Sequence, residues 1–199
     1  ADWGSDSEFM EANAEGVRRL LDAVPEPRKS ESIRCILIST ANVAGYGRRN
    51  VTEHDPAPEP RFIYSKSKLE GERIASERCD RRGIGLQILR PGGVYGPEDW
   101  KWSRRMIAQI EGGAWPLIGG GRAVFTPVYI ENLASAVEEA IRRPEADGVF
   151  NITDGARISW LEFSELIASS LGVRLATRNV PFALAYPVAA VAELVYSIV

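Results

Sequence analysis

Histidine and cysteine are scarce in this chain of 199 residues. The one histidine, His54, lies in a proline-rich loop with no second ligand near it in sequence, and we expect it to be non-catalytic. Cys35 and Cys79 have neither the spacing of a metal site nor that of a disulfide framework. We therefore expect no metal ion and a reducing, cytoplasmic setting, and the start shows no signal-peptide pattern.

An excess of charge of one sign is also lacking. Lysine and arginine total 24 residues and aspartate and glutamate 27, which gives a formal net charge of −3. Domains that bind nucleic acid carry a basic patch or stripe. The basic residues of this chain are scattered, so we expect a small-molecule partner and no nucleic acid.

An uninterrupted run of apolar residues is missing as well. Residues 180–199 carry one charge, Glu193, and a membrane-spanning helix needs about this length. Pro181, Pro187 and Glu193 interrupt the segment, however. Contact with a membrane surface is an alternative that we favour less than an amphipathic helix covering a substrate pocket.

The most informative stretch is Tyr64-Ser65-Lys66-Ser67-Lys68. It is followed by good helix formers and preceded by prolines, which predicts a helix over about residues 62–81. On a helix, Tyr64 and Lys68 project side by side because positions i and i+4 share a face. A nearby ammonium favours phenolate and lowers the pKa of a tyrosine, which suits it to proton transfer. The spacing alone also fits an exposed aromatic beside a solvated lysine.

The strand expected before this helix indicates where a substrate would bind. Residues 33–38 form a short apolar, β-branched run, as in a buried parallel strand. Ser39 and Thr40 follow at its carboxyl end, where open α/β sheets bind their ligands. The hydroxyl of Thr40, or that of Ser39, is therefore expected to hold the substrate oxygen that exchanges a proton with Tyr64.

Three motifs resemble those of the extended short-chain dehydrogenase/reductase superfamily, also called the NAD-dependent epimerase/dehydratase family. They are Ser39-Thr40-Ala41-Asn42-Val43-Ala44-Gly45, Tyr64-Ser65-Lys66-Ser67-Lys68 and Arg90-Pro91-Gly92-Gly93-Val94-Tyr95-Gly96-Pro97. The resemblance implies Thr40, Tyr64 and Lys68 as catalytic residues and NAD or NADP as the cofactor. The cofactor-binding residues that it implies are Ser39, Tyr64, Lys68, Pro91, Gly92, Gly93 and Val94.

The resemblance implies an α/β fold, namely the C-terminal part of a Rossmann-like doubly wound parallel sheet with a small, mostly helical substrate lobe. Residues 1–98 with 123–153 would form the partial NAD(P)-binding domain. Residues 99–122 and 154–199 would form the substrate-binding lobe. Within this lobe, Ser159 and Glu162 have the spacing of a capping box, which predicts the start of a helix.

The glycine-rich dinucleotide loop of the family is missing. Neither Gly83-Ile84-Gly85 nor Gly119-Gly120-Gly121 follows a strand and opens a helix, as that loop does. A helix over about residues 7–24, with Ser7 as its cap, resembles a family helix that follows four strands. We therefore expect a fragment of a longer protein that is inactive alone. Asn13 of this helix aligns with a family asparagine that organises the site, although an ordinary polar helix position fits equally well.

Several features resemble the 3β-hydroxysteroid dehydrogenase and sterol-carboxylate dehydrogenase branch, which includes oxoalkanoate reductases. They are Val43-Ala44-Gly45, Asn132, residues 149–155 and Pro181. The predicted reaction is hydride transfer between nicotinamide and a secondary alcohol or ketone, with Tyr64 as acid/base. The alternatives are a nucleotide-sugar epimerase or dehydratase, and a non-catalytic dinucleotide-sensing module. The resemblance also implies a homodimer, packed through the helices at about 7–24 and 62–81.

Overall fold

The computed structural model describes residues 4–27, 32–48, 50–100, 102–185 and 187. The chain forms two compact units. The first, called the sheet unit below, comprises Ala1–Gly92 and Glu131–Ile152, and the second, the lobe unit, comprises Gly93–Ile130 and Thr153–Val199.

A three-stranded parallel sheet, in the order β1-β2-β7, forms the centre of the sheet unit. Its strands are β1 (Arg34–Ile38), β2 (Gly85–Pro91) and β7 (Gly148–Ile152). Ile38 pairs with Leu89, and Pro91 pairs with Ile152. The three strands therefore end at the same edge of the sheet, and the chain continues from β1 into Ser39 and Thr40 at that edge.

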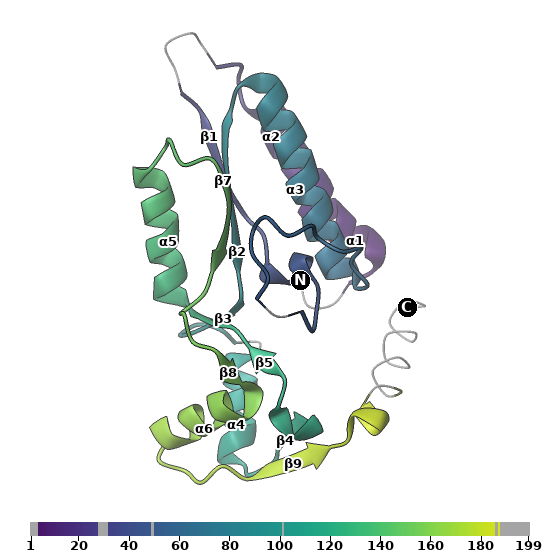
Figure 1. Ribbon diagram of the computed structural model, residues 1–199, viewed down its shortest axis with the longest axis vertical. Helices are drawn as coiled ribbons and strands as arrows, with labels where there is room; N and C mark the ends of the chain where they lie inside the picture. Colours follow the sequence, from purple (N-terminus) through teal and green to yellow (C-terminus); the bar gives the residue numbers. More distant parts are fainter. Residues whose placement is uncertain (1–3, 28–31, 49, 101, 186, 188–199) are drawn as a thin grey trace. The chain divides into compact units, whose positions relative to one another are not determined.

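Helices cover both faces of this sheet, with α2 and α3 on one side and α5 on the other (Figure 1). The helical segments of the sheet unit are α1 (Asp6–Met10), a π-helical segment (Glu11–Glu15), α2 (Gly16–Ala23), a 3₁₀ turn (Ala41–Ala44), α3 (Ile63–Arg82) and α5 (Ile130–Arg142). Apolar side chains of α2, α3 and the sheet pack into one buried cluster around Leu21, Ala75, Cys79 and Ile84. The predicted doubly wound α/β arrangement is confirmed.

The cap of the first helix lies two residues earlier than predicted. Ser5, and not Ser7, is its cap, because the Ser5 hydroxyl accepts a hydrogen bond from the backbone N–H of Glu8. The Glu8 carboxylate in turn accepts one from the backbone N–H of Ser5, at 2.7 Å. This reciprocal pair is a capping box, whose serine and glutamate stand three residues apart. Ser7 has no glutamate three residues later, so the pattern alone favoured Ser5.

The lobe unit combines two helices with short pairs of strands. Its elements are β3 (Gly93–Tyr95), α4 (Ser103–Glu111), β4 (Trp115–Ile118), a 3₁₀ turn (Gly119–Gly121), β5 (Val124–Phe125), β6 (Pro127–Tyr129), β8 (Ile158–Ser159), α6 (Trp160–Ser170) and β9 (Thr177–Val180). An aromatic core holds it together, in which the rings of Phe125 and Trp160 stack with their centroids 4.0 Å apart. The predicted capping box of Ser159 and Glu162 is present at the start of α6.

The boundary between the units differs from the predicted one. Residues 93–98, residues 123–130 and Thr153 were predicted to belong with the sheet, whereas they lie in the lobe unit. The physical reason is strand pairing: β3 and β6 pair with each other, in parallel, and form a separate two-stranded sheet.

Cys35 and Cys79 are free thiols of the sheet unit. Burial raises the pKa of Cys79 to about 11, so this thiol stays protonated at neutral pH. Over the described ranges, no group of three or more histidine, cysteine, aspartate or glutamate side chains has a geometry that could hold a metal ion.

No helix in the part of the chain that the structure describes has both the length and the apolar character needed to cross a membrane. Residue 186 and residues 188–199 lie outside the described residues. They hold most of the segment 180–199, so its predicted amphipathic helix stays a prediction.

Candidate active site

Lys68 of α3 reaches the carboxyl end of β1. Its Nζ donates a hydrogen bond to the backbone carbonyl oxygen of Ile38, 3.1 Å away. Ile38 is the last residue of β1, so this bond places the ammonium beside the segment that carries Ser39 and Thr40. An ammonium has three donors. Two of them remain for other acceptors, such as the cofactor that Lys68 was predicted to bind.

Burial and charge act on Lys68 in opposite directions. Burial lowers its pKa, because the interior solvates an ammonium less well than water does. The carboxylate of Glu72, one helical turn further along α3, raises the same pKa. The first effect is the larger, so Lys68 holds its proton less tightly than a lysine in water.

Ser39 and Thr40 are both buried, with exposed fractions of 4% and 6%. The Thr40 hydroxyl accepts a hydrogen bond from the backbone N–H of Asn42 at 3.3 Å, which caps the 3₁₀ turn, and its own proton remains for another acceptor. The Ser39 hydroxyl has no hydrogen-bond partner among the described residues. Buried polar groups usually have a hydrogen-bond partner, so this hydroxyl is available to a group from outside the chain. Both hydroxyls thus fit the predicted contacts with substrate and cofactor.

Tyr64 is the second residue of α3, so it stands one turn before Lys68 on the same face of the helix. Its ring packs edge-on against Phe9 of α1, with centroids 6.3 Å apart and an interplanar angle of 74°. Its backbone carbonyl accepts a hydrogen bond from the Ser67 hydroxyl at 3.0 Å, and that hydroxyl accepts one from the side-chain amide of Asn13, also at 3.0 Å. These contacts fix the first turn of α3 against the preceding helix.

Gly71 lets the two helices approach closely. A Cβ at this position would lie 2.3 Å from the backbone carbonyl oxygen of Asn13. Asn13 belongs to the π-helical segment, whose wider turn is often found at functional sites. The alignment of Asn13 with the family asparagine therefore has a structural counterpart: both its side chain and its carbonyl contact α3.

The predicted nicotinamide contacts divide between the units. Pro91 and Gly92 lie in the sheet unit, and Gly93 and Val94 in the lobe unit. The N–H of Gly92 donates to the carbonyl of Ile152 at 3.1 Å, and the N–H of Gly93 to that of Thr126 at 2.8 Å. These two backbone donors are therefore engaged within the protein.

Gly93 also has a structural explanation that the sequence analysis did not foresee. A Cβ at Gly93 would lie 2.3 Å from the ring of Phe125 in the lobe core. Packing within the lobe unit therefore requires a glycine here, whether or not a ligand approaches.

The sequence analysis missed a buried ion pair behind Lys68. The guanidinium of Arg90 donates to both carboxylate oxygens of Glu72, from Nε at 2.9 Å and from Nη2 at 2.6 Å. The two side chains are 9% and 6% exposed. The sequence marks the two residues but not their pairing: Glu72 continues the stripe of Tyr64 and Lys68 at the same spacing of four, and Arg90 is a charged residue inside an apolar strand.

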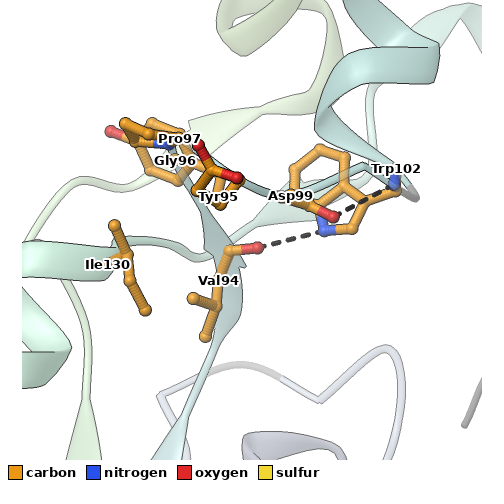
Figure 2. Close-up of a pocket in the computed structure, with 8 residues that line it drawn as sticks. Val94, Tyr95, Gly96, Pro97, Asp99, Trp102 and Ile130 are labelled. Carbon is orange, nitrogen blue, oxygen red and sulfur yellow. Dashed lines mark hydrogen bonds between the residues drawn. The ribbon is translucent and has the colours of Figure 1, made fainter.

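The lobe unit contains a cavity of about 460 Å³ directly after β3 (Figure 2). It is lined by Val94, Tyr95, Gly96, Pro97, Glu98, Asp99, Trp102 and Ile130. The indole N–H of Trp102 donates to the carbonyl of Val94 at 3.0 Å, and Asp99 accepts from the backbone N–H of Trp102 at 3.3 Å.

The charged residues that line this cavity are acidic. Two of its lining residues, Glu98 and Asp99, carry carboxylates, and none of the eight described lining residues is basic. Burial and the carboxylate of Asp154 raise the pKa of Tyr95, so its hydroxyl stays neutral. Glu98 adopts a φ of 66°, which is uncommon for a residue other than glycine. The sequence analysis gave no indication of this cavity.

Comparison with known proteins identifies a family whose model matches this chain. The sequence model of the NAD dependent epimerase/dehydratase family matches residues 1–153. The chain is 26% identical over 181 residues to the 4-hydroxy-2-methyl-3-oxo-4-farnesyl-3,4-dihydroquinoline-1-oxide ketoreductase of Stigmatella aurantiaca, a match that covers 89% of this chain and 53% of that protein. It is 27% identical over 169 residues to the dTDP-glucose 4,6-dehydratase of Streptomyces griseus, with coverages of 83% and 51%.

Among solved structures, the UDP-glucuronic acid 4-epimerase of Bacillus cereus, in complex with UDP-glucuronic acid and NAD, superposes with a TM-score of 0.76. The match covers 90% of this chain and 58% of that one, at 23% identity, and supports the fold alone. The chain spans about half the length of the curated relatives that it matches.

Proposed function

Because the chain belongs to the NAD-dependent epimerase/dehydratase family, we propose that the intact protein is an NAD(P)-dependent oxidoreductase that interconverts a secondary alcohol and a ketone. The observation that carries this proposal is the hydrogen bond from Lys68 to the end of β1. This bond holds the ammonium at the end of β1, which Ser39 and Thr40 follow, and Lys68 shares its helix face with Tyr64. A phenol, an ammonium and a second hydroxyl are groups that can together support reversible proton transfer to a carbonyl oxygen.

Each residue has a separate part in the proposed reaction. Tyr64 donates a proton to the substrate oxygen in reduction and accepts it in oxidation. Thr40 donates a hydrogen bond to the same oxygen, using the proton that its contact with Asn42 leaves over. Lys68 supplies positive charge next to Tyr64 and offers its two remaining donors to the nicotinamide ribose. Bound NAD or NADP would supply the hydride.

We infer a largely apolar substrate without negative charge, such as a 3β-hydroxysteroid, because the cavity of the lobe unit offers apolar and aromatic surface and its carboxylates disfavour an anion. Diphosphate groups are bound in proteins by arginine and lysine side chains. The described residues of the cavity offer carboxylates and aromatic surface instead. The comparisons favour neither class, since a ketoreductase and a sugar-nucleotide dehydratase match with similar identity.

The second candidate is a nucleotide-sugar epimerase or dehydratase, which would use the same three residues. A turnover experiment on the intact protein separates the two. An oxidoreductase consumes NADH or NADPH in step with reduction of an apolar ketone. An epimerase or dehydratase converts a nucleotide sugar with no net change in the nicotinamide absorbance. Conversion of nucleotide sugars alone would overturn the oxidoreductase proposal, and cofactor binding without turnover of either class would favour a sensing module.

We also propose that the intact protein is a homodimer packed through α1, α2 and α3. Leu20 of α2 supports this, because 67% of its surface is exposed. Exposed ion pairs join Arg73 to Glu70 and Glu77 on α3, so the contact would be partly polar. A monomer in sedimentation at micromolar concentration would contradict the proposal.

A further inference from the structure

The ion pair between Glu72 and Arg90 lies on the far side of Lys68 from Tyr64. Tyr64, Lys68 and Glu72 follow one another at intervals of four residues, so they form a single stripe along α3. The opposite charge comes from the sheet: Arg90 stands on β2, directly before Pro91. The pair therefore links the helix that carries the proposed catalytic residues to the strand whose end carries a predicted cofactor contact.

Burying two charges is costly unless each is fully paired. Here both oxygens of Glu72 accept hydrogen bonds from Arg90, in the two-pronged geometry that gives the strongest arginine–carboxylate contacts. Hydrophobic residues of similar size would often stabilise a fold at least as well. The presence of a charged pair at this place therefore calls for a reason other than stability.

We propose that Glu72 and Arg90 are a positioning pair that keeps Lys68 charged and directed towards the end of β1. This inference rests on the proposed function of Lys68. The carboxylate of Glu72 favours the ammonium and so opposes the effect of burial. Arg90 occupies both oxygens of that carboxylate, so Glu72 exerts its field without capturing Lys68 in an ion pair. Lys68 then remains at the carbonyl of Ile38.

Few other charges act on Lys68 in the described structure. Tyr64 precedes it on its own helix, the neutral carbonyl of Ile38 faces it from β1, and Arg90 stands behind Glu72 on β2. Glu72 is the charged side chain whose field changes the pKa of Lys68. The two members of the pair should therefore affect Lys68 in opposite senses when each is removed.

The test is an NMR titration of Lys68 in the intact protein after ¹³C-methylation of its lysines, with the signal assigned by Lys68→Arg. In Glu72→Gln, loss of the carboxylate should lower the pKa of Lys68 by about one pH unit. In Arg90→Met, the unpaired carboxylate should attract the ammonium and raise this pKa by a similar amount. Arg90→Met should also raise the KM for the cofactor several-fold, because Lys68 turns towards Glu72.

Arg73→Met is the matched control. Arg73 lies on the same helix and pairs with Glu70 and Glu77, but its side chain is 60% exposed. This variant should leave the titration of Lys68 unchanged. A purely structural pair would lower the melting temperature of both variants without moving the titration, and this result would overturn the inference.

A variant that removes both charges covers the case in which a single substitution prevents folding. Glu72→Gln combined with Arg90→Met leaves no buried charge unpaired. The pKa of Lys68 should still fall, and an unchanged value would overturn the inference. The titration needs no turnover. A protein that transfers no hydride would therefore contradict the proposed function, while the titration would still decide on the pair.

Discussion

The backbone of Asn13 and the backbone of Gly71 meet without a side chain between them: a Cβ at Gly71 would lie 2.3 Å from the Asn13 carbonyl oxygen. A real Cβ atom does not lie within 3 Å of a backbone oxygen, so a side chain at Gly71 would force one of the two helices to move. This contact lies one turn from Lys68 and fixes the distance between the π-helical segment and α3, the helix that carries Tyr64 and Ser67.

Gly71→Ala should therefore destabilise the protein by about 1–3 kcal/mol, the usual cost of overpacking, although alanine is the better helix former. Gly16→Ala is the control, because a Cβ there would lie at an ordinary 3.5 Å from the Glu11 carbonyl. That variant should gain about 0.5–1 kcal/mol. Chemical denaturation measures both, and equal effects of the two substitutions would refute the close contact.

Tyr64→Phe removes the proposed proton donor and keeps the ring that packs on Phe9. General acid–base catalysis is worth about 10²–10⁴-fold, so kcat should fall by that factor while cofactor affinity stays the same. Steady-state kinetics and a cofactor titration of the intact protein check this. Turnover near the parent rate would remove Tyr64 from the mechanism.

Lys68→Met should change stability in a pH-dependent way. Burial lowers the folded-state pKa of Lys68 below its ordinary value of 10.5. The folded protein therefore binds this proton less tightly than the unfolded chain, and the charge costs stability at neutral pH. This cost disappears as the pH rises towards the unfolded-state value. Relative to the parent, the melting temperature of Lys68→Met should thus be highest near neutral pH and decline towards about pH 10.

The control for this measurement is Lys66→Met, since Lys66 is an exposed lysine of the same helix. Removal of an exposed side chain should change the melting temperature little, which gives a baseline. A difference between Lys68→Met and the parent that stays constant over this pH range would mean that burial does not disfavour the charge of Lys68.

Ser39→Ala should leave the stability of the free protein nearly unchanged. The Ser39 hydroxyl is buried and has no hydrogen-bond partner among the described residues, so its removal breaks no contact there. An unsatisfied buried polar group contributes nothing favourable to folding. Cofactor affinity should fall several-fold if this hydroxyl binds the cofactor. Calorimetry on the intact protein measures both, and a large loss of stability with normal affinity would assign Ser39 a structural role.

Local patterns predicted the elements that hold the proposed catalytic residues. The β-branched run at 33–38 and the helix formers after Tyr64 each depend on neighbours within a few residues, and β1 and α3 lie within two residues of the predicted bounds. The capping box at Ser159 followed from the same kind of short-range signal.

Features that depend on distant residues were not predictable. The pairing of β3 with β6 decides which unit residues 93–98 join, and it joins segments about thirty residues apart. The ion pair of Glu72 with Arg90 and the close approach of Asn13 to Gly71 likewise require the packed structure. A sequence pattern identifies the residues but not their partners.

The chain leaves the sheet unit between Gly92 and Gly93, returns between Ile130 and Glu131, and leaves again between Ile152 and Thr153. Strand β7, the neighbour of β2, is therefore synthesised only after most of the lobe elements. During synthesis on the ribosome, the edge of β2 that pairs with β7 therefore stays unpaired until β7 has been made. In genetic terms, neither unit can be cloned as one uninterrupted segment, so a single crossover cannot exchange a whole lobe between homologous genes.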